Sequence, residues 1–270
     1  MFRIQDIKGT GDHIIAYKII EKKYIDSIAK RGQIYFGLLE DYRKMEDQGK
    51  HEIGDCYEAA LTNKVHEYIN IGGEYQEIHG PHAGNNIRIN ANQCAFCFYM
   101  VGLKSFIHEA DDRYRLCIPY HELKVLCKDK GGIENCAIII FDSDTVIKIY
   151  DALKGRGFHY AGAKIAYDDY DYIPKCDIKS QDYALEYCFH KLKQYAYQNE
   201  FRIAVLNKEK EPIKDFFIDV EENEIQVLDL KDGYDFCSYV KLTPNIISEK
   251  IVEVKFDMEH TLEAVKKHET

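Results

Sequence analysis

The chain has 270 residues, of which 46% are hydrophobic, and a formal net charge of −10. This length and apolar content suit a substantial core in one large domain or two small ones, and one domain is expected. The acidic excess argues against a protein that coats nucleic acid non-specifically, because such binding needs many Lys and Arg contacts to phosphates; it leaves a local basic groove open. No apolar run reaches about 18 residues and the first residues lack the blocks of a signal peptide, so the sequence predicts a cytoplasmic protein without a membrane segment.

The nine cysteines lie mostly inside apolar runs such as CAFCFYMV, at 94–101. Cysteine behaves there as a small buried hydrophobe, so a disulfide scaffold is not expected. Cys94 and Cys97 have the spacing of a metal or redox pair. No second pair lies at ligand spacing, and on a strand these two thiols point to opposite faces, so no metal site is predicted.

The first half of the chain alternates strands and helices. Hydrophobic periodicity and turn residues predict a strand at 14–20, a helix at 21–32, a strand at 33–39, a charged loop-like block at 40–59 and an apolar strand at 92–102. Residues 63–93 form a less regular, Gly-rich segment, and the sequence leaves open whether it is a lid or a long excursion.

In the second half, Pro119 opens a predicted helix that ends near Gly131. The following expected elements are a strand at 135–141, a helix at 142–155, a strand at 158–167, an acidic Tyr-rich loop at 168–175, a helix at 182–193, a strand at 195–206, strands at 215–220, 225–230, 238–243 and 250–256, and a last helix that packs Leu262 and Val265. No repeat or linker divides the chain. We therefore expect a single α+β domain over residues 1–270 rather than a doubly wound parallel sheet.

The strand predicted at 195–206, YAYQNEFRIAVL, carries polar residues at alternating positions. Gln198, Glu200 and Arg202 would share one face, because every second side chain of a strand points the same way. Two other polar clusters are Tyr17-Lys18 on the first strand and YFGLLEDYR at 35–43. Each cluster alone has an ordinary explanation: Glu200 and Arg202 as an ion pair on an exposed sheet edge, and Tyr-Lys as amphipathic filler.

Taken together, the clusters resemble the ADP-ribosyltransferase superfamily of toxins. The resemblance implies a split β-sheet core with flanking helices that binds NAD between three strands. Tyr17 takes the first-strand position, where the family usually has His or Arg, so the chain departs from the pattern there. The second-strand position falls on Tyr35, which Phe36 and Gly37 follow. The third strand bears the catalytic Glu two residues after Gln, as in the pair Gln198 and Glu200.

The order of motifs is also similar to a bacterial family of defence-associated proteins. Its members open with a YK strand, continue into a block of the form YFG…YR…E…GD…E, and later carry an E-x-R-I strand. Here these are AYKII, IYFGLLEDYRKMEDQGKHEIGDCYEA and NEFRIAV, which span most of residues 14–206. The resemblance implies a toxin of a toxin–antitoxin or anti-phage defence system, with an antitoxin protein as its neutralising partner.

The resemblance implies that Glu200 is the catalytic residue for cleavage of NAD. Cleavage between nicotinamide and ribose passes through an oxocarbenium-like state, which a carboxylate beside the ribose stabilises. Gln198 would align the incoming nucleophile. The polar face of the strand would then be the rim of an NAD pocket, with Arg202 holding the local geometry by pairing with a carboxylate.

Other side chains are expected to hold the rest of the NAD substrate. Tyr35 and Tyr42 would sandwich the nicotinamide ring. Arg43, Lys18 or Arg202 would neutralise the pyrophosphate.

The acceptor of the ADP-ribose is expected to be nucleic acid, RNA or DNA, ahead of protein. Gln-x-Glu members of the superfamily modify either amide side chains or guanine bases. Tyr167, Tyr170 and Tyr172 in the acidic loop suit base stacking, whereas the Asp residues between them would repel a phosphate backbone. A solvated acidic loop with its Tyr stems packed down is the favoured interpretation of this segment, and an antitoxin docking surface is a further alternative.

Two alternatives come from other functional classes. The first is a non-catalytic sensor or adaptor with a degenerate version of this fold, which binds a nucleotide or a partner protein; the missing first-strand His or Arg is its main support. The second is a metal-dependent nuclease that uses Asp41, Asp55 and Glu58, but these carboxylates lack a paired Lys at a recognisable spacing.

Overall fold

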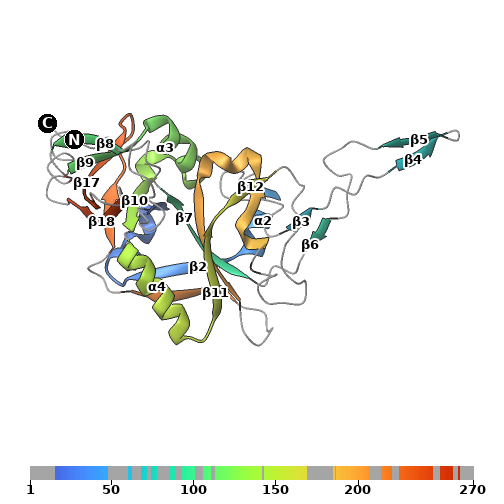
Figure 1. The fold of residues 1–270 in the computed structure, drawn as a ribbon, viewed down its shortest axis with the longest axis horizontal. Helices are drawn as coiled ribbons and strands as arrows, with labels where there is room; N and C mark the ends of the chain where they lie inside the picture. Colours follow the sequence, from blue (N-terminus) through green and yellow to red (C-terminus); the bar gives the residue numbers. More distant parts are fainter. Residues whose placement is uncertain are drawn as a thin grey trace. The chain divides into compact units, whose positions relative to one another are not determined.

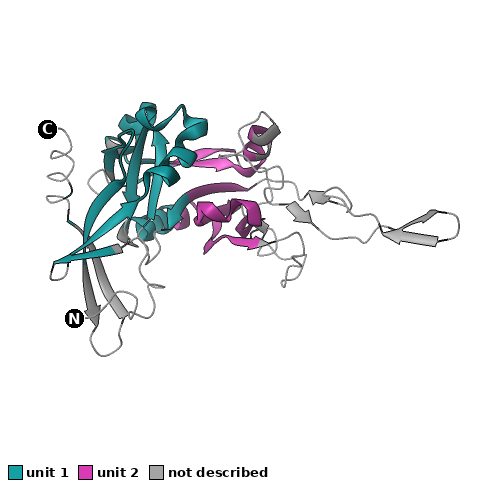
Figure 2. Ribbon diagram, turned by 90° about the horizontal axis from the view of Figure 1, so that it is seen from above, with its two compact units in different colours: residues 1–34, 98–152, 218–270 teal, residues 35–97, 153–217 magenta. Residues whose placement is uncertain are grey.

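The computed structural model describes residues 16–47, 60–62, 68–71, 74–77, 86–88, 93–100, 106–110, 113–141, 143–168, 185, 187–206, 214–220, 225–245, 250–257 and 261. The chain forms two compact units, unit 1 (residues 1–34, 98–152 and 218–270) and unit 2 (residues 35–97 and 153–217), shown in Figure 2. Because the units interleave along the chain, no single boundary in the sequence separates them.

Figure 1 shows helices interspersed with strands among the described residues, and the larger sheets are antiparallel, which makes the fold α+β. The α-helices of the described residues are α1 (Ile25–Ala29), α2 (Leu39–Asp47), α3 (Tyr120–Cys127) and α4 (Ser143–Gly155). The short 3₁₀ helices are η2 (Lys22–Tyr24), η4 (Lys128–Lys130), η5 (Ile133–Asn135), η6 (Tyr187–Phe189) and η7 (Lys193–Gln198). None of the helices in the described ranges has the length and apolar character needed to cross a membrane.

Unit 1 contains an antiparallel sheet built on the strands that the sequence predicts most clearly. Strand β10 (Cys136–Phe141) lies between β1 (Ala16–Glu21) and β16 (Gln226–Asp229). On one face of this sheet, Tyr17, Ile19, Ile138 and Ile140 pack with Leu123 of α3. β1 and β10 thus confirm the strands predicted from apolar runs, and one face of each packs under a helix.

A second antiparallel sheet of unit 1 has the order β18-β17-β9-β8. Its strands are β8 (Phe106–Ala110), β9 (Arg113–Ile118), β17 (Phe236–Asn245) and β18 (Lys250–Phe256). The predicted strands at 238–243 and 250–256 are thereby confirmed. Leu262 and Val265, expected in the last helix, lie outside the described residues.

Unit 2 holds the strand that carries the candidate catalytic Glu. Strand β14 (Glu200–Leu206) pairs antiparallel with β11 (His159–Lys164) and neighbours β7 (Cys94–Met100), whose first residues pair with β2 (Gln33–Leu38). Two short strands, β12 (Ala166–Asp168) and β13 (His190–Leu192), pair in parallel. The core of this unit contains five buried residues from separate segments: Leu39, Ala95, Leu185, Cys188 and Ala204.

The remaining strands of the described residues are short. β3 (Ala60–Thr62) pairs with β6 (Asn86–Arg88), and β4 (Tyr68–Ile71) pairs with β5 (Glu74–Glu77). Strand β15 (Phe216–Asp219) confirms the strand predicted at 215–220. The excursion at 63–93 thus includes β-structure at 68–71, 74–77 and 86–88.

Three predictions of local structure are wrong. The helix expected at 182–193 does not extend through residues 187–192, which form η6 and β13, because residues 190–192 pair with β12. The strand expected at 195–206 begins only at Glu200, after η7 and a left-handed Asn199 with φ of 40°. The block at 40–59 begins as helix α2 and not as a loop. Tertiary pairing overrides weak local preferences in the first case.

Candidate functional site

The start of β14 is held in place by hydrogen bonds to Ile165, just before β12, and to Tyr167 of β12. The Ile165 N–H donates to the carbonyl oxygen of Glu200 at 2.9 Å, and the Glu200 N–H donates to the Tyr167 hydroxyl at 2.9 Å. Asn199 makes the turn into the strand in the left-handed region, where Asn is among the few non-glycine residues that fit readily. Tyr167 lies opposite Lys191 in the parallel β12–β13 pair. This pairing brings Lys191 to the start of β14, beside Glu200.

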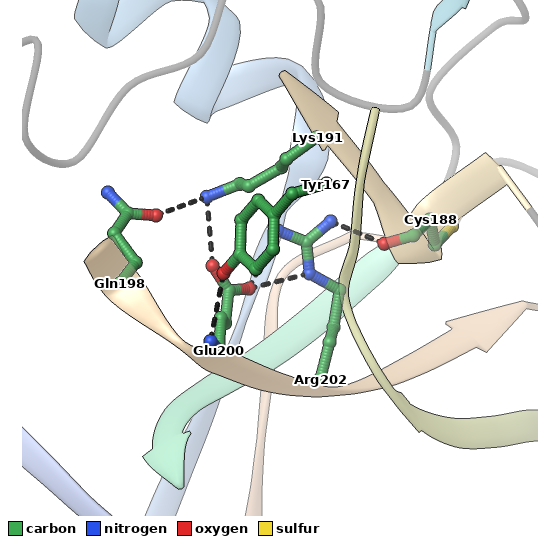
Figure 3. Close-up of polar contacts among 6 residues, drawn as sticks. All are labelled: Tyr167, Cys188, Lys191, Gln198, Glu200 and Arg202. Carbon is green, nitrogen blue, oxygen red and sulfur yellow. Dashed lines mark hydrogen bonds and ion pairs between the residues drawn. The ribbon is translucent and has the colours of Figure 1, made fainter. Parts of the chain in front are cut away.

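Glu200 is the centre of a buried ionic cluster, defined here as Glu200, Arg202, Lys191 and Gln198 (Figure 3). Arg202 approaches one carboxylate oxygen: its Nε donates to Oε1 at 2.9 Å, and its Nη2 lies 2.8 Å from the same atom. The Nζ of Lys191 donates to the other oxygen, Oε2, at 2.8 Å. The Glu200 side chain is only 8% exposed, so each carboxylate oxygen faces a cation rather than water.

Arg202 and Lys191 fix the cluster to the rest of unit 2. Arg202 is 1% exposed, and its Nη1 donates to the carbonyl oxygen of Cys188 at 2.6 Å. Lys191 also donates to Oε1 of Gln198 at 2.9 Å, as Figure 3 shows. Gln198 therefore joins the cluster through Lys191, from the end of η7, and not by alternation along a strand.

The polar face of β14 is not an exposed edge. Gln198, Glu200 and Arg202 are all buried, and so are Phe201 and Ile203 on the other face. The expected pairing of Arg202 with a carboxylate is present, and the carboxylate is Glu200 itself. The alternative prediction of a Glu200–Arg202 ion pair on an exposed sheet edge is therefore correct about the pair and wrong about its exposure.

The cluster keeps Glu200 ionised. Burial by itself raises the pKa of a carboxyl group, but the charges of Arg202 and Lys191 outweigh burial and hold the pKa of Glu200 far below its ordinary value. A carboxylate in this state is a poor proton shuttle near neutral pH. It is instead a fixed negative charge that can stabilise a positive charge developing beside it.

The depressed pKa of Glu200 predicts a specific loss of stability in acid. A carboxyl group whose pKa is lower in the folded state stabilises the fold fully above its unfolded-state pKa, about 4.5, and this stabilisation declines as the pH falls below that value. We expect the difference in unfolding temperature between the wild type and Glu200→Gln to be constant near neutral pH and to shrink below about pH 4.5. The measurement is thermal unfolding of both proteins from neutral pH to below about pH 4.5. A difference in unfolding temperature that stays constant over this range would contradict the prediction.

Tyr167 is a second residue whose removal should weaken the site. Burial raises the pKa of Tyr167 to about 12, so its hydroxyl stays protonated while it accepts the Glu200 N–H. We expect Tyr167→Phe to lower the free energy of unfolding by about 1 kcal/mol, because a partly buried N–H loses its acceptor. Tyr35→Phe is the matched control, since it removes only an exposed hydrogen bond to Asp215. Equal losses in both variants, measured by denaturant unfolding, would rule out a special role for Tyr167.

The predicted second-strand residues form an aromatic group in unit 2. Tyr35 is 43% exposed, donates to Oδ2 of Asp215 at 3.1 Å, and has its ring centroid 5.2 Å from that of Phe217. Phe36 points into the core and stacks on Phe216 at 5.0 Å.

Gly37 on β2 leaves room for Tyr35 and Tyr42, the two tyrosines expected to sandwich the nicotinamide ring. A Cβ at Gly37 would lie 3.1 Å from Cε1 of Tyr35 and 3.2 Å from the hydroxyl oxygen of Tyr42, so both rings use the space that a side chain would fill. Arg43 is on α2, and its side chain lies outside what the structure describes.

Tyr17 and Lys18 belong to unit 1, whereas the ionic cluster belongs to unit 2. Tyr17 is buried in the core of unit 1, where its ring stacks on Tyr99 with centroids 5.2 Å apart, and burial raises its pKa well above the ordinary value. Lys18 is half-buried on β1, opposite Ile139 of β10.

Sequence reasoning missed Lys191. It placed this residue on a helix and gave it no role, because a lone lysine with no partner at helical or strand spacing carries no local signal. The nuclease alternative gains no support from the described residues: Asp41 pairs with Lys44 at 3.2 Å on α2, and Asp55 and Glu58 lie outside the described ranges. Within those ranges, no three His, Cys, Asp or Glu side chains gather as metal ligands.

Comparisons with protein-family models, with curated proteins and with solved structures find no match for this chain. The resemblance to ADP-ribosyltransferases therefore stays a prediction. The ionic cluster contains a buried carboxylate that two cations hold in one geometry and whose pKa they lower.

Proposed function

We propose that the protein is an NAD-dependent mono-ADP-ribosyltransferase and that Glu200 is its catalytic carboxylate. The observation that carries the proposal is the fixed position of Glu200 between two cations, with one carboxylate oxygen held by Arg202 and the other by Lys191. Because its charge does not have to reorganise during the reaction, such a carboxylate is suited to an oxocarbenium-like transition state.

The proposed reaction breaks the bond between the nicotinamide nitrogen and the anomeric carbon of ribose. The bonding electron pair leaves with nicotinamide, a nucleophilic atom of the acceptor forms the new bond to the anomeric carbon, and the acceptor's proton passes to solvent. Glu200 stabilises the positive charge on the ribose, and Gln198 aligns the acceptor. Arg202 and Lys191 are positioning residues that act through Glu200, and Lys191 also orients the Gln198 amide.

We propose that the acceptor is RNA or DNA. The exposed pair of Tyr35 and Phe217 in unit 2 supports this choice, because two accessible aromatic rings offer stacking surfaces to a base or to the nicotinamide ring. The biological setting proposed with it is a toxin of a toxin–antitoxin or anti-phage system. The proposed partners are NAD, a nucleic acid and an antitoxin protein, and the proposed location is the cytoplasm.

A second function is supported by the burial of the same cluster. Gln198, Glu200 and Arg202 are buried and hydrogen-bonded within the fold, as the members of a structural ion-pair network are. In that function the protein is a non-catalytic sensor or adaptor that binds a nucleotide or a partner protein. The cluster then fixes the start of β14 and takes no part in chemistry.

Label transfer from NAD separates the two functions and names the acceptor. The purified protein is incubated with NAD that carries a radioactive adenylate phosphate, together with total cellular RNA, DNA or protein. The transferase predicts label in one fraction that depends on Glu200. The absence of label in every fraction, with a folded protein that still binds NAD or a partner, would favour the sensor or adaptor.

A further inference from the structure

Two cysteines of unit 1 face each other across neighbouring strands. Cys117 on β9 is directly opposite Cys237 on β17 in the antiparallel register. Their Sγ atoms are 3.4 Å apart, with the Cys237 thiol donating to the sulfur of Cys117. Both residues are partly exposed to solvent. This pair has no part in the ionic cluster or in the proposed reaction with NAD.

The backbone at this pair already suits a disulfide. Residues directly opposite in an antiparallel ladder have Cα atoms about 4.5–5.5 Å apart. A disulfide needs a Cα separation of about 4.4–6.8 Å. Because the two ranges overlap, a bond between the sulfurs requires only side-chain rotation. We propose that Cys117 and Cys237 are a redox-reactive dithiol that closes to a disulfide by exchange with a small-molecule disulfide.

The small-molecule disulfide is the oxidant in two successive thiol–disulfide exchange steps. The Cys117 thiolate attacks one sulfur of the small-molecule disulfide, which forms a mixed disulfide at Cys117 and releases one thiolate. The Cys237 sulfur then attacks the Cys117 sulfur of that mixed disulfide and releases the second thiolate. Two electrons pass to the oxidant, which ends as two thiols, and the protons of the two cysteines balance the thiolates that leave.

The hydrogen bond within the pair favours Cys117 as the first nucleophile. Burial and the hydrogen bond to Cys117 raise the pKa of the Cys237 thiol to about 12, so Cys237 keeps its proton near neutral pH. Cys117 accepts that hydrogen bond, lies with its own thiol 4.0 Å from Oδ2 of Asp235, and is partly accessible to an oxidant. Once the mixed disulfide has formed, Cys237 is already in contact with the sulfur that it attacks.

The chain contains a matched control pair. Cys127 and Cys136 are also in contact through their thiols, but both are fully buried in the core of unit 1. Proximity alone would make both pairs react. The proposal requires proximity together with access, so it predicts reaction at Cys117 and Cys237 and none at Cys127 and Cys136.

The test uses the full chain in buffers of increasing oxidised-to-reduced glutathione ratio. Free thiols are then alkylated, and the protein is digested without reductant for mass spectrometry. We expect a linked peptide that joins Cys117 to Cys237, reversed by dithiothreitol, and alkylated thiols at Cys127 and Cys136. Cys127→Ser should retain the linked peptide, whereas Cys237→Ser should hold a stable mixed disulfide at Cys117.

The wild-type experiment keeps the proposal open to refutation even if a variant fails to fold. Wild-type protein that stays folded, judged by circular dichroism, and gives no Cys117–Cys237 peptide at any ratio would overturn the proposal. Stable glutathione adducts at both cysteines without a link would overturn it too, because the second exchange step would then not occur.

Discussion

We expect Glu200→Gln to transfer ADP-ribose from NAD at least roughly a hundredfold more slowly than the wild type, in line with the effect of removing one preorganised electrostatic group from an active site. The substitution keeps the size of the side chain and removes its charge. Arg202 and Lys191 would still surround the position, but nothing would offset the positive charge that develops on the ribose. The measurement is the initial rate of label transfer to the acceptor fraction, per folded molecule.

The same substitution should also lower stability, which the sequence alone does not suggest. A strand with an exposed polar edge predicts little change in folding for Glu200→Gln. The buried cluster predicts a loss of about 3 kcal/mol, because two buried cations lose their common counter-charge. The transfer rate therefore has to be measured at a temperature well below the unfolding midpoint of the variant.

Asp257→Asn is the matched control for this experiment. Asp257 also lies between an arginine and a lysine: its Oδ2 is 3.0 Å from Nε of Arg113 and 3.7 Å from Nζ of Lys241, and its side chain is 10% exposed. It belongs to unit 1 and has no role in the proposed chemistry. We expect Asp257→Asn to keep the transfer rate. A rate that survives in folded Glu200→Gln, or that falls equally in both variants, would contradict the catalytic role of Glu200.

The second large effect is expected on stability, from Arg202→Met. Arg202 is among the largest fully buried side chains, and its guanidinium bonds to Glu200 and to the carbonyl of Cys188. Removing one partner of a buried ion pair destabilises a protein by about 3–5 kcal/mol. For a chain of this size, that corresponds to an unfolding midpoint about 10 °C lower. Thermal and denaturant unfolding at neutral pH measure it.

Arg113→Met is the control for Arg202→Met. Arg113 also pairs with a carboxylate, Asp257, but its side chain is 31% exposed, so its loss should have a smaller effect, about 1 kcal/mol or less. Similar losses of unfolding free energy in the two variants would show that burial does not increase the contribution of the Arg202 ion pair to stability.

Replacing the whole charged centre separates its structural role from its chemical role. In Lys191→Met/Glu200→Leu/Arg202→Met no buried charge is left without a partner, and buried ion pairs exchanged for apolar groups are often neutral or stabilising. We expect the triple variant to recover most of the stability lost in Arg202→Met but none of the transfer activity. Recovered stability together with recovered transfer would place the chemistry elsewhere.

The candidate site was only partly accessible from the sequence. That Glu200 and Arg202 share a face follows from their spacing on a strand, which is a local property. Gln198 was assigned to the same group for the wrong reason, because Asn199 interrupts the strand and the contact runs through Lys191. Lys191 reaches Glu200 only because β13 pairs with β12, a contact between segments more than twenty residues apart in the sequence.

By itself the sequence determined the elements whose signals are local: strands β1, β7 and β10 from their apolar runs, and helices α3 and α4 from their periodicity and their flanking Pro and Gly residues. Local signals suffice there because each element's own residues decide its conformation. Only the tertiary structure decided that the polar face of β14 is buried and that Glu200 lies between two cations. Burial and charge pairing depend on which distant segments cover a strand, and no spacing within the strand records that.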